Sequence, residues 1–375
     1  MRSDVKGSPG QIKWLIYGAN GYTAELIARE AVRRGLTPVL AGRSREKIEP
    51  LAKELGLEAR SVSLDDATQV AQQIEGHAIV LHCAGPFSAT AEPMMEACLQ
   101  ARAHYLDITG EIAVFELAQS LNARARAAGI VLCPGVGFDV IPTDCVAAAL
   151  KAALPDATHL ALGFDSRSGM SPGTAKTSVE GLAQGGKVRR DGKIVTVPLA
   201  FKVRRIDFGD GEKDAMTIPW GDVSTAYYST GIPNIEVFIP GSPAMIANAR
   251  RANWIRPLLG LSLVQKLLKA HVAKTVKGPS EEKRARMPTF VWGRSQQCPR
   301  GEEDCAHSHR EWLQPDHHGF ARRCRTPHEK QLAGGRVHAI QVGRRRSGDT
   351  PARIGASADR LVPHCVVSHG YVDGT

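Results

Sequence analysis

The sequence is poor in aromatic residues and has no apolar run long enough to cross a bilayer. Phe, Trp and Tyr supply 5% of the 375 residues, within a hydrophobic fraction of 43%. A transmembrane helix needs about 20 mainly apolar residues, whereas the dense apolar stretch at residues 254–268 is shorter and interrupted by Arg and Lys. These proportions exclude a chain disordered throughout and predict a soluble globular protein with a buried core.

A secretory pattern is also missing. The eight cysteines show no short-spaced framework, and residues 1–11 are polar, without the apolar core of a targeting signal. We therefore expect a cytoplasmic location. The formal net charge of +10 would suit an acidic partner, but a basic balance often reflects only a solvated surface, so nucleic acid is not expected as a partner.

Residues 12–150 alternate short β-branched runs with alanine-rich helical stretches, which is typical of βαβ units around a doubly wound parallel sheet. Strands are predicted at residues 14–17, 38–41, 59–62, 79–82, 105–108 and 130–133. Helices are predicted at residues 24–34, 45–55, 66–74, 92–101 and 115–128. The first domain is thus expected to have an α/β fold.

Residues 151–293 have a different hydrophobic pattern: segments in which apolar and polar residues alternate are separated by Gly and Pro. Strands at 193–197, 202–206 and 235–239 and a helix at 174–183 predict an α+β second domain. Residues 244–277 are helical in pattern, and 254–268 predict an amphipathic helix starting near Trp254, with Pro257 in its first turn. This helix is expected either to pack on its own protein or to rest on a lipid surface.

A glycine-rich turn follows the first predicted strand and opens directly into a helix. Gly18 would allow a tight turn, Gly21 would let the backbone approach a pyrophosphate, and Ala24 would keep the helix close to the sheet. This is the dinucleotide fingerprint of a Rossmann domain, although an empty Rossmann-like turn would have the same pattern. The cofactor-binding residues predicted here are Gly18, Ala19, Asn20, Gly21, Tyr22 and Thr23.

The end of the second strand indicates which dinucleotide binds. An NAD enzyme usually has Asp or Glu there, for the ribose hydroxyls. This sequence has Arg43 and Ser44 instead, a guanidinium and a hydroxyl suited to a 2′-phosphate. NADP(H) is therefore the predicted cofactor; the alternative is a solvated Arg43 at a helix start.

Further loops follow later strands and should lie at the same sheet edge. Ala84, Gly85 and Pro86 would run beside the nicotinamide ribose. Asp107 and Glu111 are the candidate catalytic residues, because carboxylates there could position substrate or transfer protons, although helix capping is the commoner role. Two other acids in these loops are Asp139 and Asp144.

Five motifs together carry a resemblance: residues 18–23, 41–44, 84–87, 105–111 and 137–144. They resemble the saccharopine dehydrogenase-like oxidoreductases, in the branch with mycobacterial trans-acting enoyl reductases and the animal saccharopine dehydrogenase-like protein. The likeness continues through 171–177 and 219–222 to 292–293. It implies an NADP-binding Rossmann domain beside a mixed second domain, but no Arg and Lys cluster suited to a dicarboxylate amino-acid adduct is evident.

Residues 294–375 differ from the rest of the chain in composition and in apolar pattern. They hold eight of the thirteen histidines and four of the cysteines, and apolar periodicity largely disappears. Zinc binding is one interpretation, but the spacing fits no usual set of paired ligands, and no metal site is predicted. Reading back-translated codons for 310–318 and 335–342 one nucleotide later permits segments similar to the family, so we interpret this region as a frame-shifted, unstructured tail.

These patterns predict an NADP(H)-dependent oxidoreductase that transfers hydride to or from a small or lipid-linked substrate. Two alternatives remain. One is a trans-acting enoyl reductase of lipid or polyketide synthesis, and the other is a non-catalytic nucleotide-binding protein at a membrane surface. A peripheral membrane contact through residues 254–268 and self-association into a homo-oligomer are left open.

Overall fold

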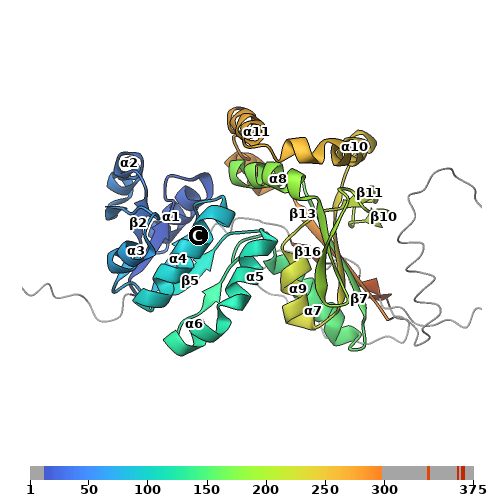
Figure 1. The fold of residues 1–375 in the computed structure, drawn as a ribbon, viewed down its shortest axis with the longest axis horizontal. Helices are drawn as coiled ribbons and strands as arrows, with labels where there is room; N and C mark the ends of the chain where they lie inside the picture. The colour runs from blue at the N-terminus through green and yellow to red at the C-terminus, as the bar shows by residue number, and fades with distance from the viewer. Residues whose placement is uncertain (1–11, 298–335, 338–360, 363–364, 368–375) are drawn as a thin grey trace, which may run out of the picture.

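The computed structural model describes residues 12–297, 336–337, 361–362 and 365–367. Within them two sheets lie side by side along the long axis, each with its own helices (Figure 1). The first is six-stranded and parallel, in the order β3-β2-β1-β4-β5-β6, which is the strand order of a Rossmann domain. Its strands are β1 (Trp14–Tyr17), β2 (Val39–Gly42), β3 (Ala59–Ser61), β4 (Ile79–His82), β5 (His104–Asp107) and β6 (Leu132–Cys133).

Both faces of this sheet are covered, as a parallel sheet requires. Along β1, Leu15 and Tyr17 belong to one apolar cluster and Ile16 to another, so successive side chains are buried on opposite faces. The predicted Rossmann fold of the first domain is confirmed. Its helices are α1 (Tyr22–Arg33), α2 (Arg45–Leu55), α3 (Ala67–Ile74), α4 (Phe87–Ala101), α5 (Ile112–Ser120) and α6 (Asn122–Ala128).

Two predicted helices of this domain differ from the structure. The helix expected at 92–101 begins at Phe87, so that Pro93 lies inside it rather than at its start. The helix expected at 115–128 is two helices, α5 and α6, which meet at Leu121. Leu121 is buried in the core of the domain.

The first domain also ends earlier than residue 150. Helix α7 (Ile141–Ala153) buries Val146 and Leu150 against Leu160 and Leu162 of the second sheet. Because its apolar face packs there, α7 belongs to the core of the second domain. The boundary therefore lies near Val140, where the β6 loop enters the helix.

The second domain is a mixed sheet with helices on two sides (Figure 1). Its main path runs β10-β11-β12-β7-β13-β14-β15, with the β8–β9 hairpin joined to β12 and β16 joined to β13. This arrangement confirms the predicted second sheet domain. Its strands are β7 (His159–Ser166), β8 (Gly186–Arg190), β9 (Lys193–Val197), β10 (Val203–Asp207), β11 (Glu212–Thr217), β12 (Asn234–Pro240) and β13 (Thr289–Gln296). The other elements are α8 (Pro172–Gln184), α9 (Asp222–Thr230), α10 (Pro243–Leu259), α11 (Ser262–Thr275), α12 (Glu281–Arg286), β14 (Arg336–Val337), β15 (Leu361–Val362) and β16 (Cys365–Val367).

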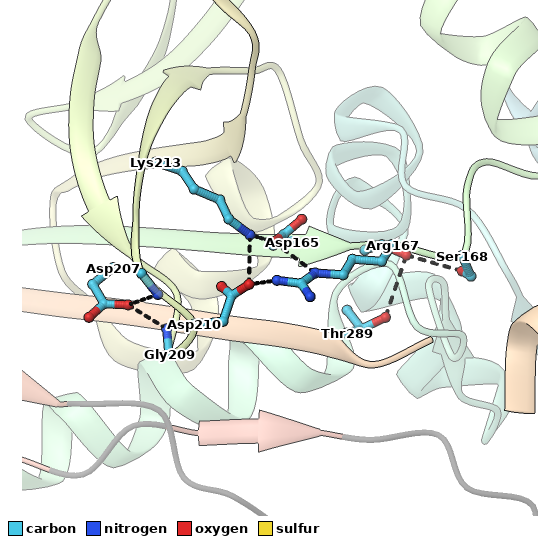
Figure 2. Close-up of polar contacts among 10 residues, drawn as sticks. Asp165, Arg167, Ser168, Asp207, Gly209, Asp210, Lys213 and Thr289 are labelled. Carbon is cyan, nitrogen blue, oxygen red and sulfur yellow. Dashed lines mark hydrogen bonds and ion pairs between the residues drawn. The ribbon is translucent and has the colours of Figure 1, made fainter. Parts of the chain in front are cut away.

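An ion-pair cluster fixes the end of β7 to the turn between β10 and β11 (Figure 2). Lys213 Nζ lies 2.5 Å from Asp165 Oδ2 and 3.1 Å from Asp210 Oδ2, and Arg167 pairs with both carboxylates. The Arg167 guanidinium also lies over the ring of Phe290 in β13. Two cations and two anions are thus matched, so this cluster has a structural role.

The predicted tail boundary at 294 falls inside β13. This strand pairs with β7 from Thr289 to Gln296, so the sheet runs past that boundary. Three short strands of the predicted tail are described, and β14 and β16 pair with β13. The proposed frame shift otherwise falls on residues outside the described part of the chain and stays a prediction.

The apolar stretch 254–268 is not one helix. It comprises the end of α10, a break at Gly260 and Leu261, and the start of α11. Pro257 lies in the last turn of α10 rather than in a first turn, so the predicted start near Trp254 is wrong. No helix in the described residues is long and apolar enough to cross a membrane.

Candidate cofactor and substrate site

The turn after β1 is held in a tight, preformed shape. The Gly18 and Ala19 amides donate to the carbonyl of Ala41 at 2.8 and 3.0 Å, and Gly21 N donates to Gly18 O at 2.9 Å. Gly18 has a φ of +82°, and an ideal Cβ there would lie 2.8 Å from Ala84 Cβ. Only glycine fits between the loops that follow β1 and β4.

Several helices begin at this sheet edge, and the N-termini of α1 and α4 differ. Helix α1 starts after Gly21 without a side-chain cap. The first turn of α4 instead receives the Glu111 carboxylate, which accepts from Phe87 N at 2.9 Å and Ser88 N at 2.7 Å. Because free N–H groups and the helix dipole attract anions, a pyrophosphate fits at α1 and not at α4.

The end of β2 lies beside the glycine turn. An ideal Cβ on Gly42 would lie 3.0 Å from Ile48 Cδ1 and 3.8 Å from Asn20 Oδ1. Next along the chain, Arg43 is exposed and Ser44 precedes α2, whose first turn has no side-chain cap. Arg43 and Ser44 thus lie at the end of β2, next to the glycine turn in the fold, and their contact with a 2′-phosphate stays a prediction.

The loop after β4 is braced from within its own helix. Thr90 Oγ1 donates to the carbonyl of Ala84 at 2.7 Å and contacts that of Pro86 at 3.1 Å. Behind it, the buried His82 ring lies 2.9 Å from the same hydroxyl, and burial lowers the pKa of His82 to about 3. This neutral imidazole supports a loop that runs along the predicted cofactor edge.

The second domain reaches over the glycine turn after β1. The Tyr22 hydroxyl donates to the carbonyl of Pro279 at 2.5 Å, and an ideal Cβ on Gly278 would lie 3.2 Å from the Tyr22 ring and 3.3 Å from Pro172. The start of α8 and the 278–279 loop therefore cover the start of α1. Tyr22 holds this cover through its side-chain hydroxyl.

Asp107 is fully buried in a network of its own. Its carboxylate accepts from the Tyr105 hydroxyl at 2.6 Å, Thr109 N at 2.9 Å and Gly135 N at 2.7 Å. Burial raises the pKa of Asp107 to about 6, opposed by these three donors. The bonds join the ends of β5 and β6, so these contacts are structural. Its contact with substrate, and that of the α4-capping Glu111, stay predictions.

Asp139 differs from the other acids at this junction. Asp144 accepts from Ser229, whereas the Asp139 carboxylate has no hydrogen-bond donor among the described residues. It packs against Gly110 and Trp220. Burial, and then the charge of Asp107, raise the pKa of Asp139 to about 6. Among these four acids, Asp139 is the one whose carboxylate is left for a ligand.

Asp222 lies in the same junction and was missed as an acid of interest. The sequence shows it only as part of the 219–222 motif, yet it is fully buried and neither oxygen has a well-aligned hydrogen-bond donor. Burial raises its pKa to about 8, and Thr143 opposes the rise. Asp222 is thus protonated at neutral pH. Nothing in a sequence marks such burial, which depends on how α7 and α9 pack.

No three His, Cys, Asp or Glu side chains in the described residues are placed to hold a metal ion. The Cys- and His-rich segment considered for zinc falls almost entirely outside those residues. The candidate site therefore comprises a glycine turn, a helix N-terminus without a side-chain cap, a basic residue after β2 and the Asp139 carboxyl group. These features fit NADP(H), whose anionic groups match the first three.

Comparisons with known proteins agree with this geometry. Residues 14–133 match the family model of the saccharopine dehydrogenase NADP binding domain. The human saccharopine dehydrogenase-like oxidoreductase is 30% identical over 156 residues, covering 35% of each chain. A trans-acting enoyl reductase of Mycobacterium tuberculosis is 32% identical over 138 residues, covering 35% of this chain and 33% of its own.

The chain spans about a third of the length of these curated relatives. Among solved structures, saccharopine dehydrogenase (L-Glu forming) from Saccharomyces cerevisiae aligns over 73% of this chain and 70% of its own, with 13% identity and a TM-score of 0.48. The match to this family model supports NADP(H) as the cofactor of the first domain.

Proposed function

We propose that this chain, whose residues 14–133 belong to the saccharopine dehydrogenase NADP binding domain family, is an NADP(H)-dependent oxidoreductase acting on a small or lipid-linked substrate. The observation that carries the proposal is the pairing of an open α1 N-terminus with Arg43 and Ser44 at the end of β2. These groups match a pyrophosphate and a 2′-phosphate. Bound NADPH would supply the hydride.

The residues of this chain would orient the two reactants and exclude water. The 278–279 loop and the start of α8 cover the phosphate turn, and the Tyr22 bond to Pro279 holds them in place. The loop at 84–86 would flank the nicotinamide ribose. Asp139, protonated below about pH 6, would hand a proton to the reduced substrate.

A titration of the full chain with NADPH and NADH, followed by nicotinamide fluorescence, tests the cofactor half of this proposal. We expect NADPH to bind at least tenfold more tightly, since charged hydrogen bonds to a phosphate are worth about 1.5–3 kcal/mol. A panel of enoyl thioesters and imines, monitored at the absorbance of reduced nicotinamide, then tests turnover. The proposal would be contradicted if neither NADPH nor NADH bound to the chain.

A specific observation favours enoyl reduction as the second candidate: the similarity to a trans-acting enoyl reductase within the first domain. Faster NADPH oxidation with enoyl thioesters than with imines would support it. The non-catalytic alternative draws support from Asp107 and Glu111, whose carboxylates both accept structural hydrogen bonds. NADPH binding without oxidation by any substrate of the panel would favour that alternative.

A further inference from the structure

The helices α10 and α11 present their apolar side chains to solvent. Trp254 is 89% exposed, Leu263 68% and Leu267 64%. No side chain of α11 is buried, and in α10 only Ile246 is. The sequence left packing on the protein itself and a lipid surface open; α11 contacts α8 on its inner side, while these apolar side chains stay exposed. We call this surface the apolar ridge, and its members are Trp254, Ile255, Leu258, Leu261, Leu263 and Leu267.

Polar side chains hold the inner side of these helices. Gln265 Nε2 donates to the carbonyls of Val179 and Leu259 at 3.2 and 2.7 Å. Lys269 pairs with Glu180 of α8, and Asn253 exchanges hydrogen bonds with the backbone of Leu199. Polar groups thus make these contacts on the inner side, while Trp254, Leu263 and Leu267 face outward. These contacts fix the ridge in its exposed position.

The charge around the ridge has one sign. Residues 237–280 contain no Asp or Glu. Five cations of this stretch are exposed and make no ion pair among the described residues. A large exposed apolar surface marks an interaction site, and one on helices whose charged side chains are all cations fits an anionic partner, since the neighbouring Glu180 is already paired with Lys269. The exposed cations are Arg250, Arg251, Lys266, Lys274 and Lys277.

We infer that α10 and α11 dock on an anionic lipid surface, with the ridge in the acyl boundary and the cations at the headgroup phosphates. A basic face with exposed Trp and Leu is typical of helices that lie in the membrane interface. A second copy is disfavoured as occupant, because it would oppose the same cations. Residues 294–375 are disfavoured too, since they carry thirteen Arg and Lys against nine Asp and Glu.

Flotation of the full chain with vesicles tests the inference. We expect binding to phosphatidylcholine vesicles containing phosphatidylserine, weakened by salt and at least tenfold weaker with phosphatidylcholine alone. The triple variant Trp254→Ala/Leu263→Ser/Leu267→Ser should lose at least tenfold in binding. These side chains are exposed, so folding should be preserved. The matched control Leu36→Ser/Val131→Ser, at exposed apolar residues of the first domain, should bind like the parent.

The charge contribution is tested separately. Lys266→Glu/Lys274→Glu should weaken binding on the order of tenfold or more, since each cation near an anionic surface is worth about 1 kcal/mol. Arg126→Glu/Lys193→Glu, two exposed cations elsewhere, serves as control. Equal binding to neutral and anionic vesicles, or no binding at all, would overturn the inference. A dimer of the parent in sedimentation that is lost in the triple variant would also overturn it, because the apolar ridge would then be a contact between two copies of this chain.

Discussion

The Glu111 carboxylate lies 2.7 Å from the backbone nitrogen of Ser88 and occupies the N-terminus of α4. It comes from the loop after β5, so one side chain joins two of the loops at the cofactor edge. The contact also distinguishes the two helix ends there. Because α4 already has an anion, the phosphates of a dinucleotide are directed to α1.

Replacing this carboxylate should destabilise the fold. In Glu111→Gln one oxygen still accepts, but the amide group now faces an N–H that it cannot pair with. We expect a loss of about 1–3 kcal/mol in the free energy of unfolding, measured in urea. Glu92→Gln, at an exposed position of the same helix, should change it by less than about 0.5 kcal/mol. Equal effects of both changes would contradict the capping role.

Gly18→Ala should abolish NADPH binding in the titration. The new Cβ would meet Ala84 at 2.8 Å, so the turn after β1 or the loop after β4 must move. Gly76→Ala is the matched control, because Gly76 has a similar φ of +76° and nothing within 4 Å of its ideal Cβ. Both variants carry a strain of about 1–2 kcal/mol from the left-handed backbone. Retained binding in Gly18→Ala would show that the turn can shift freely.

The first domain could be predicted well because its elements have strong local patterns. The bounds predicted for β1, β4 and α2 are those of the structure, since each is a clear apolar run or a helix with defined ends. The α10–α11 pair could not be predicted in this way. A dense apolar stretch normally packs inward, and its exposure depends on tertiary contacts such as Gln265 with Val179.

In the candidate site, too, some features follow from local sequence and others from tertiary contacts. The glycine turn and Arg43 are contiguous with a strand and a helix, so their placement follows from local sequence. Asp107 and Glu111 were correctly placed at the sheet edge, but their hydrogen-bond partners Gly135 and Ser88 are distant in sequence. Tertiary packing decides which carboxylate accepts hydrogen bonds from the protein and which remains for a ligand. The sequence alone therefore gave no reason to prefer Asp139 to Asp107 or Glu111 as the acid that meets substrate.

Arg43→Ala should separate the two cofactors. Loss of a charged hydrogen bond worth about 1.5–3 kcal/mol should weaken NADPH by roughly ten- to a hundredfold and leave NADH almost unchanged. Arg45→Ala, an exposed Arg in the first turn of α2, is the control and should have little effect on either. Equal losses for NADPH and NADH would remove Arg43 from the 2′-phosphate site.

Asp139→Asn should reduce turnover while NADPH binding is retained. A general acid contributes roughly a hundred- to ten-thousandfold to the rate, and an amide cannot release its proton. Because the pKa of Asp139 is raised to about 6, the rate of the parent should fall as the pH rises above about 6. Asp144→Asn, whose carboxylate bonds to Ser229, should keep that pH profile. An unchanged rate in Asp139→Asn would exclude Asp139 as the proton donor.

Asp222 should make the fold less stable as the pH rises. Its pKa is raised by burial from 3.8 to about 8, so between these values the folded protein holds a proton that the unfolded chain has released. The free energy of unfolding therefore falls with pH across this window, at up to about 1.4 kcal/mol per pH unit. Asp222→Asn cannot titrate, and urea unfolding of this variant should depend less steeply on pH from about 4 to 8. Asp156→Asn, at an exposed residue, controls for the charge change. Parallel curves for the parent and Asp222→Asn would mean that Asp222 is ionised in the folded protein, with a donor paired to its carboxylate.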